Sequence, residues 1–114
     1  MTPKLESMIL LELRERHLGP GRAIPRDQLM SLFGIDPKDV TQDRRFREWY
    51  SDFGIPVCEH GLYIPRGPAD VDACARYLWP KMDPKRHGAR MQRIYLRFPH
   101  CSPERGEQLE LRIP

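Results

Sequence analysis

The 114-residue sequence lacks any apolar run long enough to cross a bilayer, and its first residues, MTPKLESM, lack the pattern of a signal peptide. Cysteine is scarce, and three widely spaced cysteines do not build a disulfide scaffold. There is also no nucleophile motif, no glycine-rich phosphate loop and no carboxylate pair in an apolar frame. These absences argue against a membrane protein, a disulfide-rich secreted domain and the commonest enzyme classes. We therefore expect a cytoplasmic protein that is not an enzyme and carries no cofactor.

Histidine and cysteine occur, but their spacing does not predict a metal site. No CxxC or HxxxH pair is present, and the closest pairs are Cys58-x-His60 and His100-Cys101. Cys58 and Cys74 fit core positions as small apolar residues. We expect no bound metal.

The composition indicates one globular domain with an appendage, with 39% hydrophobic and 31% charged residues. A net charge of +3 does not by itself indicate a nucleic-acid partner. Arginine far outnumbers lysine, which favours bidentate contacts to phosphates or bases, although the base composition of a gene can produce the same bias. The distribution of charge therefore matters more than its sum.

The rest of the chain is organised around residues 41–65. The first part, 41–53, has the period of a helix, with Thr41 as a good N-cap and Gly54 as a good residue to end it. Four aromatic residues at i, i+3, i+4 and i+7 form one face that must be buried. They are Phe46, Trp49, Tyr50 and Phe53. The second part, 55–64, changes to a period of two around Glu59-His60-Gly61, which predicts a hairpin with a three-residue loop.

Two further helices and a short extended segment precede this centre. The apolar spacing predicts a helix over 4–17, ended by Gly19-Pro20-Gly21, and a second helix over 26–33 with Leu29, Leu32 and Phe33 inward. Residues 23–25 are expected to be extended and to lie beside the hairpin, because the residue before a proline avoids helical geometry.

Two helices are expected after the hairpin, over 69–79 and 85–98, with a proline joint between them. In the last helix an apolar face lies opposite a stripe of four arginines. These arginines are Arg86, Arg90, Arg93 and Arg97. Alternation at 109–113 predicts a short strand. We therefore divide the chain into a domain at 1–80 and a C-terminal helix and tail at 81–114.

Three stretches resemble a known family: LFGI at 32–35, DRRFR at 43–47, and GIPVC at 54–58 followed by GLYI at 61–64. Over residues 5–78 the chain is similar to small winged helix-turn-helix domains, which are frequent in phage and prophage proteins and in bacterial transcriptional regulators. The resemblance implies an α+β, mostly α fold: a three-helix core with a β-hairpin wing, here followed by a helical extension. One departure is the stretch between Gly34 and Thr41, which is longer than the tightest helix-turn-helix connection.

The outward face of the helix at 41–53 is the first candidate for contact with DNA, because arginine forks match guanine edges and phosphates. The expected contacts are Arg44, Arg45, Arg47 and Ser51. The alternative is a solvated helix face, since Glu48 has the spacing to pair with Arg44, and Asp52 weakens the positive field.

His60 at the hairpin tip and Arg66 at its exit are further candidates, because wing side chains reach phosphates or the minor groove in many such domains. A hairpin tip is exposed in any case, so exposure alone also explains His60. The arginine stripe at 86–97 suits a phosphate backbone or an acidic protein partner, but a solvated outer face is a common alternative. The apolar face opposite suits packing on its own domain or on a twofold mate, which predicts a homodimer formed by residues after Pro80.

These observations favour a double-stranded DNA-binding protein, either a transcription regulator or a replication accessory of phage or bacterial origin. The helix at 41–53 would enter the major groove while the wing and basic side chains hold phosphates. The rival interpretation is a phage protein-binding module that docks on a host enzyme or polymerase and modulates it. The modest net charge and the acids at 48 and 52 keep this rival open.

Overall fold

The computed structural model describes residues 1–102 and shows a mostly helical α+β domain with a small antiparallel hairpin; the strand predicted at 109–113 lies outside them. The elements in chain order are α1 (Pro3–Arg16), η1 (Pro20–Arg22), α2 (Arg26–Leu32), α3 (Val40–Phe53), β1 (Val57–Cys58), β2 (Gly61–Leu62), α4 (Pro68–Leu78), η2 (Trp79–Lys81), α5 (Pro84–Arg97) and η3 (Pro99–Cys101). The predicted order of elements is confirmed. No helix within these residues is both long and apolar enough to span a membrane.

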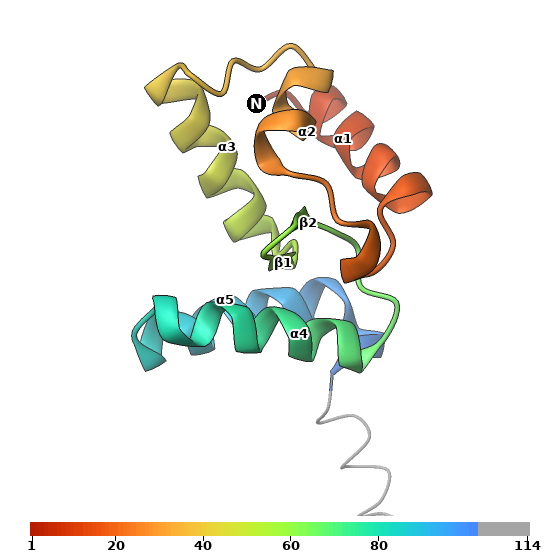
Figure 1. The fold of residues 1–114 in the computed structure, drawn as a ribbon, viewed down its shortest axis with the longest axis vertical. Coiled ribbons are helices and arrows are strands. Elements are labelled where there is room, and N and C mark those ends of the chain that lie inside the picture. Colours follow the sequence, from red (N-terminus) through yellow and green to blue (C-terminus); the bar gives the residue numbers. More distant parts are fainter. Residues whose placement is uncertain (103–114) are drawn as a thin grey trace, which may run out of the picture.

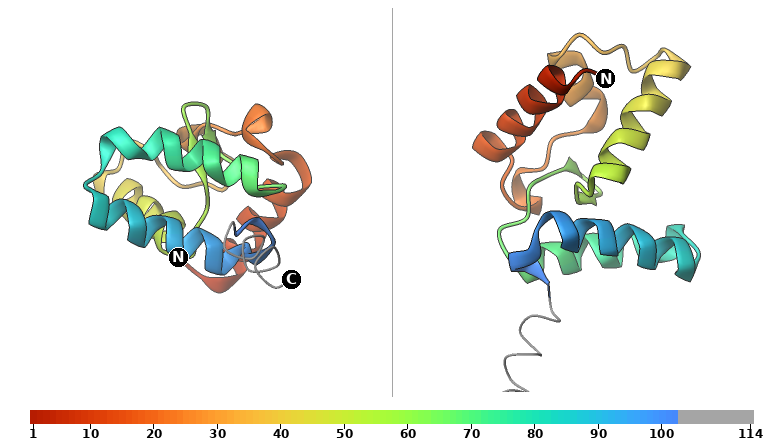
Figure 2. Two further views of the ribbon diagram at one scale, coloured as in Figure 1. Left: turned by 90° about the horizontal axis from the view of Figure 1, so that it is seen from below. Right: turned by 180° about the vertical axis from the view of Figure 1, so that it is seen from behind.

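The helices form two layers with the hairpin between them (Figure 1). Helices α1, α2 and α3 make one layer, and α4 and α5 lie side by side as a helical hairpin in the other (Figure 2). The C-terminal end of α3 meets α5, so the two layers enclose a corner. This corner holds most of the arginines that the sequence singles out.

The small sheet is extended by one residue of the preceding loop. Ile24 and Leu62 exchange two backbone hydrogen bonds of 2.9 Å, so the extended segment predicted beside the hairpin is confirmed. The predicted three-residue loop is wrong: Cys58 pairs with Gly61, which leaves two residues in the loop. Gly61 has φ +129°, and a Cβ there would overlap the carbonyl oxygen of Ile24. A glycine is therefore needed where the two segments meet.

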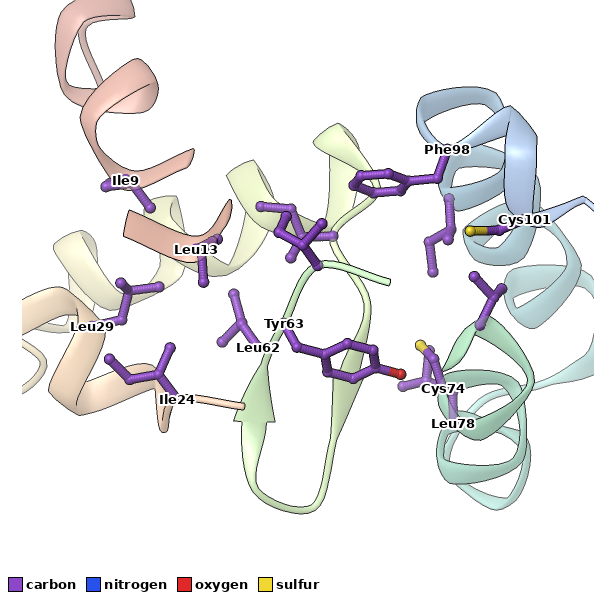
Figure 3. Packing of buried hydrophobic residues seen from close by; sticks show 14 of the residues in the cluster. Ile9, Leu13, Ile24, Leu29, Leu62, Tyr63, Cys74, Leu78, Phe98 and Cys101 are labelled. Atoms are coloured by element: carbon purple, nitrogen blue, oxygen red, sulfur yellow. The ribbon is translucent and has the colours of Figure 1, made fainter. Parts of the chain in front are cut away.

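One hydrophobic cluster runs through both layers and includes residues on either side of Pro80 (Figure 3). Leu62 lies with Ile24 and Leu29 on one side of the hairpin, whereas the ring of Tyr63 lies toward Cys74 of α4. The apolar face of α5 packs into the same cluster through Met91, Ile94 and Phe98. The hairpin therefore lies between the two layers, and apolar side chains of both layers pack against it.

The aromatic face of α3 packs on this core, but only one of its four residues is fully buried, so the predicted burial is confirmed in part. Phe46 is buried, and its ring centroid lies 5.7 Å from those of both Trp49 and Tyr50, which are half-buried like Phe53. The expected N-cap is wrong by two residues: the carboxylate of Asp39 accepts hydrogen bonds from the amides of Thr41 (2.9 Å) and Gln42 (3.1 Å). An aspartate that can satisfy two free amides caps better than the threonine, which lies inside the first turn.

Two other details differ at the surface and at the end of α3. Leu32, predicted inward, is 57% exposed, because Leu29 and Met30 take the buried face of the short α2. Gly54 ends α3 in the left-handed conformation as predicted, with φ +91°. A Cβ there would lie 2.5 Å from the carbonyl oxygen of Arg93, so α3 and α5 meet backbone to backbone at this residue.

Candidate nucleic-acid interface

The exposed polar face of α3 lies on its N-terminal part. Arg44 and Arg45 are exposed, and neither forms an ion pair within residues 1–102. Val40 at the start of the helix is 81% exposed. Arg44 does not pair with Glu48, although the spacing allows it. The first turns of α3 therefore present arginine forks that have no hydrogen-bond acceptor within the described part of the chain.

Arg47 has a partner that the sequence analysis did not assign. Its Nη2 and Nε atoms lie 2.7 Å and 3.1 Å from Oδ2 of Asp43, one turn earlier. Arg26 of α2 lies 3.3 Å from the other oxygen of Asp43, so the buried carboxylate holds an arginine on each side. The i, i+4 spacing of Asp43 and Arg47 is a signal that could have identified the pair. The Arg47 side chain stays 56% exposed and keeps donors free.

Two of the predicted DNA contacts, Ser51 and Arg90, lie where α3 packs against α5 and not on an exposed face. Helix α5 crosses α3 at its C-terminal end, and Nη1 of Arg90 donates a hydrogen bond of 2.9 Å to the Ser51 hydroxyl. Arg90 is only 8% exposed. The predicted stripe is therefore not a continuous solvent-facing row, because α5 turns this residue into the junction with α3. Ser51 is half-buried there, away from the exposed turns of the helix.

The other members of the stripe occupy different environments. Arg97 stacks on Phe53, with its guanidinium carbon 3.8 Å from the ring centroid, and its Nε donates to the Phe53 carbonyl at 3.1 Å. Arg93 lies 3.9 Å from the exposed Asp52. The side chain of exposed Arg86 forms no ion pair within the described residues. Arg86 and Arg93 thus remain available, whereas Arg97 mainly joins α5 to α3.

Arg90 is a buried cation that forms no ion pair with any carboxylate among residues 1–102. Its Nε and Nη2 atoms are buried and have no hydrogen-bond acceptor in this described part of the chain. Its guanidinium carbon lies 5.6 Å from the centroid of the Tyr50 ring, a weak favourable contact. Burial lowers the pKa of Arg90 from its ordinary value, because loss of hydration disfavours the charged form. Keeping Arg90 charged in this buried position therefore lowers the stability of the fold.

Two hollows adjoin at Arg47, Tyr50 and Arg90. The larger, the hairpin groove, has a volume of about 980 Å³ and lies between the hairpin tip, the start of α2 and the end of α4. The basic side chains that line it are Arg26, Arg47, His60, Lys81 and Arg90. The smaller, the α3–α5 hollow, has a volume of about 440 Å³. It is lined by Arg47, Glu48, Tyr50, Ser51, Asp52, Met82, Arg86, Ala89, Arg90 and Arg93.

The two wing candidates also differ from each other. His60 is exposed at the hairpin tip, where its Nε2 lies 3.3 Å from Glu59. Arg66 is held by Asp70, whose carboxylate accepts from the Arg66 amide at 2.8 Å and from its Nε at 3.0 Å. The side-chain hydrogen bond from Arg66 is the main cause that lowers the pKa of Asp70 below its ordinary value. Arg66 therefore fastens the start of α4 to the hairpin exit.

Sequence reasoning missed Arg26 and Lys81, which line the hairpin groove together with predicted residues. They come from α2 and η2, and only the folding of separate segments onto the hairpin brings them together. Within residues 1–102, no three potential metal ligands gather into one group. Comparisons with protein-family models, with curated proteins and with solved structures each find no match for this chain.

Proposed function

We propose that this protein binds double-stranded DNA as a winged helix-turn-helix domain, with the N-terminal turns of α3 at the major groove. The order of helix, extended segment, two helices and hairpin supports this interpretation. Recognition helices of such domains contact base edges with their N-terminal residues. On α3 these turns are exposed, whereas the C-terminal end is covered by α5.

The observation that carries the proposal is a pair of arginines on the exposed part of α3 that form no ion pair within the described part of the chain. Among residues 1–102, neither Arg44 nor Arg45 forms an ion pair or a side-chain hydrogen bond, so their donors can reach base edges or phosphates. Arg47, Arg86 and Arg93 surround the adjoining corner and would add phosphate contacts. His60 at the hairpin tip is a further candidate contact. A regulatory or replicative role of phage or bacterial type follows from the family resemblance.

The test is a fluorescence anisotropy titration with a random duplex and a selected site over a series of salt concentrations. Replacing Arg44 or Arg45 with Ala should weaken binding, by about 1–3 kcal/mol where the arginine reads a base. A variant that loses only a phosphate contact should reduce the salt slope by roughly one unit. Arg14→Ala is the matched control, because Arg14 is an exposed arginine on α1 that lines neither of the two hollows. Wild-type affinity in the Arg44 and Arg45 variants would contradict the proposal.

The rival function, docking on a protein partner, is favoured by large apolar side chains on the surface of the second layer. Leu96 is 75% exposed and Trp79 is 58% exposed. If no duplex binds at low salt, a protein partner becomes the better account of the arginines as well. The predicted homodimer remains a proposal, to be tested by light scattering. The apolar face of α5 that motivated it packs within the chain, so any dimer contact would have to use other residues.

A further inference from the structure

Arg90 places a positive charge in the junction between α3 and α5. No carboxylate forms an ion pair with it among residues 1–102, and only Nη1 has a hydrogen-bond acceptor, the Ser51 hydroxyl. A buried guanidinium normally has a carboxylate or an equivalent set of acceptors, since desolvation of an unpaired charge is costly. A buried arginine without such acceptors therefore indicates a binding site for an anion.

The α3–α5 hollow next to Arg90 has the chemistry to receive one. Four arginines from two helices line it, against the two carboxylates of Glu48 and Asp52. Within residues 1–102, Arg86 has no ion-pair partner, and the ion pair of Arg93 is the distant contact of 3.9 Å to Asp52. The Ser51 hydroxyl adds a polar group on the α3 wall. The hollow is therefore a cationic cavity with free donors at its rim and a buried charge beneath it.

We propose that the α3–α5 hollow binds a phosphate group, with Arg86 and Arg93 as donors at the rim and Arg90 as the charge beneath it. The planar arginine fork matches the tetrahedral oxygens of phosphate through paired N–H donors. Nε and Nη2 of Arg90 are buried. Because the protein interior screens charge less than water does, an anion in the hollow stabilises the charged form of Arg90 through electrostatic attraction. The site does not depend on duplex binding, because the shared chemistry is the phosphate group, either free or in a nucleic acid.

The first experiment titrates inorganic phosphate into the full-length protein at constant ionic strength, adjusted with sodium chloride. Binding is followed by NMR at the arginine Nε–Hε signals and by thermal melting. We expect saturable shifts of the Arg86, Arg90 and Arg93 signals and a phosphate-dependent rise in Tm. Replacing Arg86 or Arg93 with Ala should raise the Kd for phosphate roughly tenfold. Arg14→Ala should leave that Kd unchanged.

The second experiment uses Arg90→Met, which keeps an unbranched chain of similar length but removes the charge. In phosphate-free buffer this variant should melt no lower than the wild type, because removal of the charge relieves its desolvation. Its Tm should no longer rise with phosphate. An equal rise of Tm in Arg90→Met and wild type would overturn the proposal. If Arg90→Met does not fold, the wild-type titration and the two rim variants still decide the question.

A last arm separates the two sources of phosphate and keeps this site distinct from the duplex proposal. Oligonucleotide duplexes with and without a 5′-phosphate compete against bound inorganic phosphate. Competition by both indicates a backbone phosphate, competition only by the phosphorylated duplex indicates a terminal one, and competition by neither indicates free phosphate. Each of these three outcomes supports the site, provided that the first experiment shows binding of inorganic phosphate. Duplex binding without any effect of inorganic phosphate on the wild type would refute the site and leave the duplex proposal standing.

Discussion

Arg90 and Ser51 lie 2.9 Å apart, Nη1 to hydroxyl oxygen, and this hydrogen bond joins α5 to the C-terminal end of α3. It connects the helix predicted to read DNA with the helix predicted to hold its backbone. The two ends of α3 therefore differ in exposure: its first turns are open to a ligand, whereas its last turn is packed against α5.

Loss of the Ser51 hydroxyl should destabilise the junction. Ser51→Ala removes the one hydrogen-bond acceptor that Arg90 has among the described residues, and a buried charged donor left without a partner costs about 1–3 kcal/mol. The free energy of unfolding in urea measures the effect. Ser31→Ala, on the exposed side of α2, is the control and should stay within about 0.5 kcal/mol of the wild type. Equal stability of both variants would show that Arg90 finds other acceptors.

Phe46 should be the aromatic residue of α3 on which stability depends most. It is 1% exposed, and truncation of a buried phenylalanine to alanine typically costs ~3–5 kcal/mol. Phe46→Ala should therefore be close to unfolded at 25 °C in so small a domain, as circular dichroism melting will show. Leu32→Ala removes an apolar side chain that is 57% exposed and should melt near the wild type. Cooperative, wild-type-like melting of Phe46→Ala would contradict the observed core.

Gly54 and Gly34 form a natural pair for measuring crowding at the α3–α5 crossing. Both have positive φ, +91° and +70°, but a Cβ at Gly34 meets nothing within 4 Å. Gly34→Ala should therefore report backbone strain alone, about 1–2 kcal/mol. At Gly54 the added methyl group also meets the Arg93 backbone, which adds roughly 1–3 kcal/mol. Urea denaturation of both variants measures the difference, and equal losses would mean that α5 shifts away freely.

Acid should weaken the attachment of α4 through Asp70. Its pKa in the folded state is lowered, mainly by the side-chain hydrogen bond from Arg66, and an unfolded aspartate titrates near ~3.9. The stabilisation is therefore present above about pH 4 and is lost as pH falls through the lower folded pKa. Asp70→Asn should show a shallower fall of Tm below about pH 4 than the wild type. Asp72→Asn, at an exposed position on the same helix, should keep the wild-type profile.

Most of the secondary structure could be predicted because it depends on local signals. The periodic apolar positions of α1, α3 and α5, the proline joint and Gly54 identify the elements within a residue or two. The N-cap of α3 was misplaced because Asp39 and Thr41 are both acceptable caps, and only the path of the chain decides between them. Leu32 was placed inward because α2 is too short for its period to fix a face.

The candidate site was less predictable, because it depends on how distant segments pack. Four arginines at helical spacing predict a common face, and Arg86, Arg90 and Arg93 do line one hollow. The spacing does not say what that face contacts, and α3 turned out to be its neighbour. Arg26 and Lys81 join the larger groove only through tertiary contact. Periodicity finds a surface on one element, whereas the partner across the gap is a property of the whole fold.

The covered hairpin also constrains the order of events in folding. Leu62 and Tyr63 serve opposite layers, so neither layer can bury its inner face before the hairpin is in place (Figure 3). Pairing of Ile24 with Leu62 closes a long loop. Closing this loop costs conformational entropy early in folding, before the contacts that depend on the hairpin can form. We expect Leu62→Ala to slow refolding in stopped-flow experiments, and Ile94→Ala in α5 to act mainly by speeding unfolding. The reverse pattern would mean that α4 and α5 assemble first and that the hairpin inserts between finished layers.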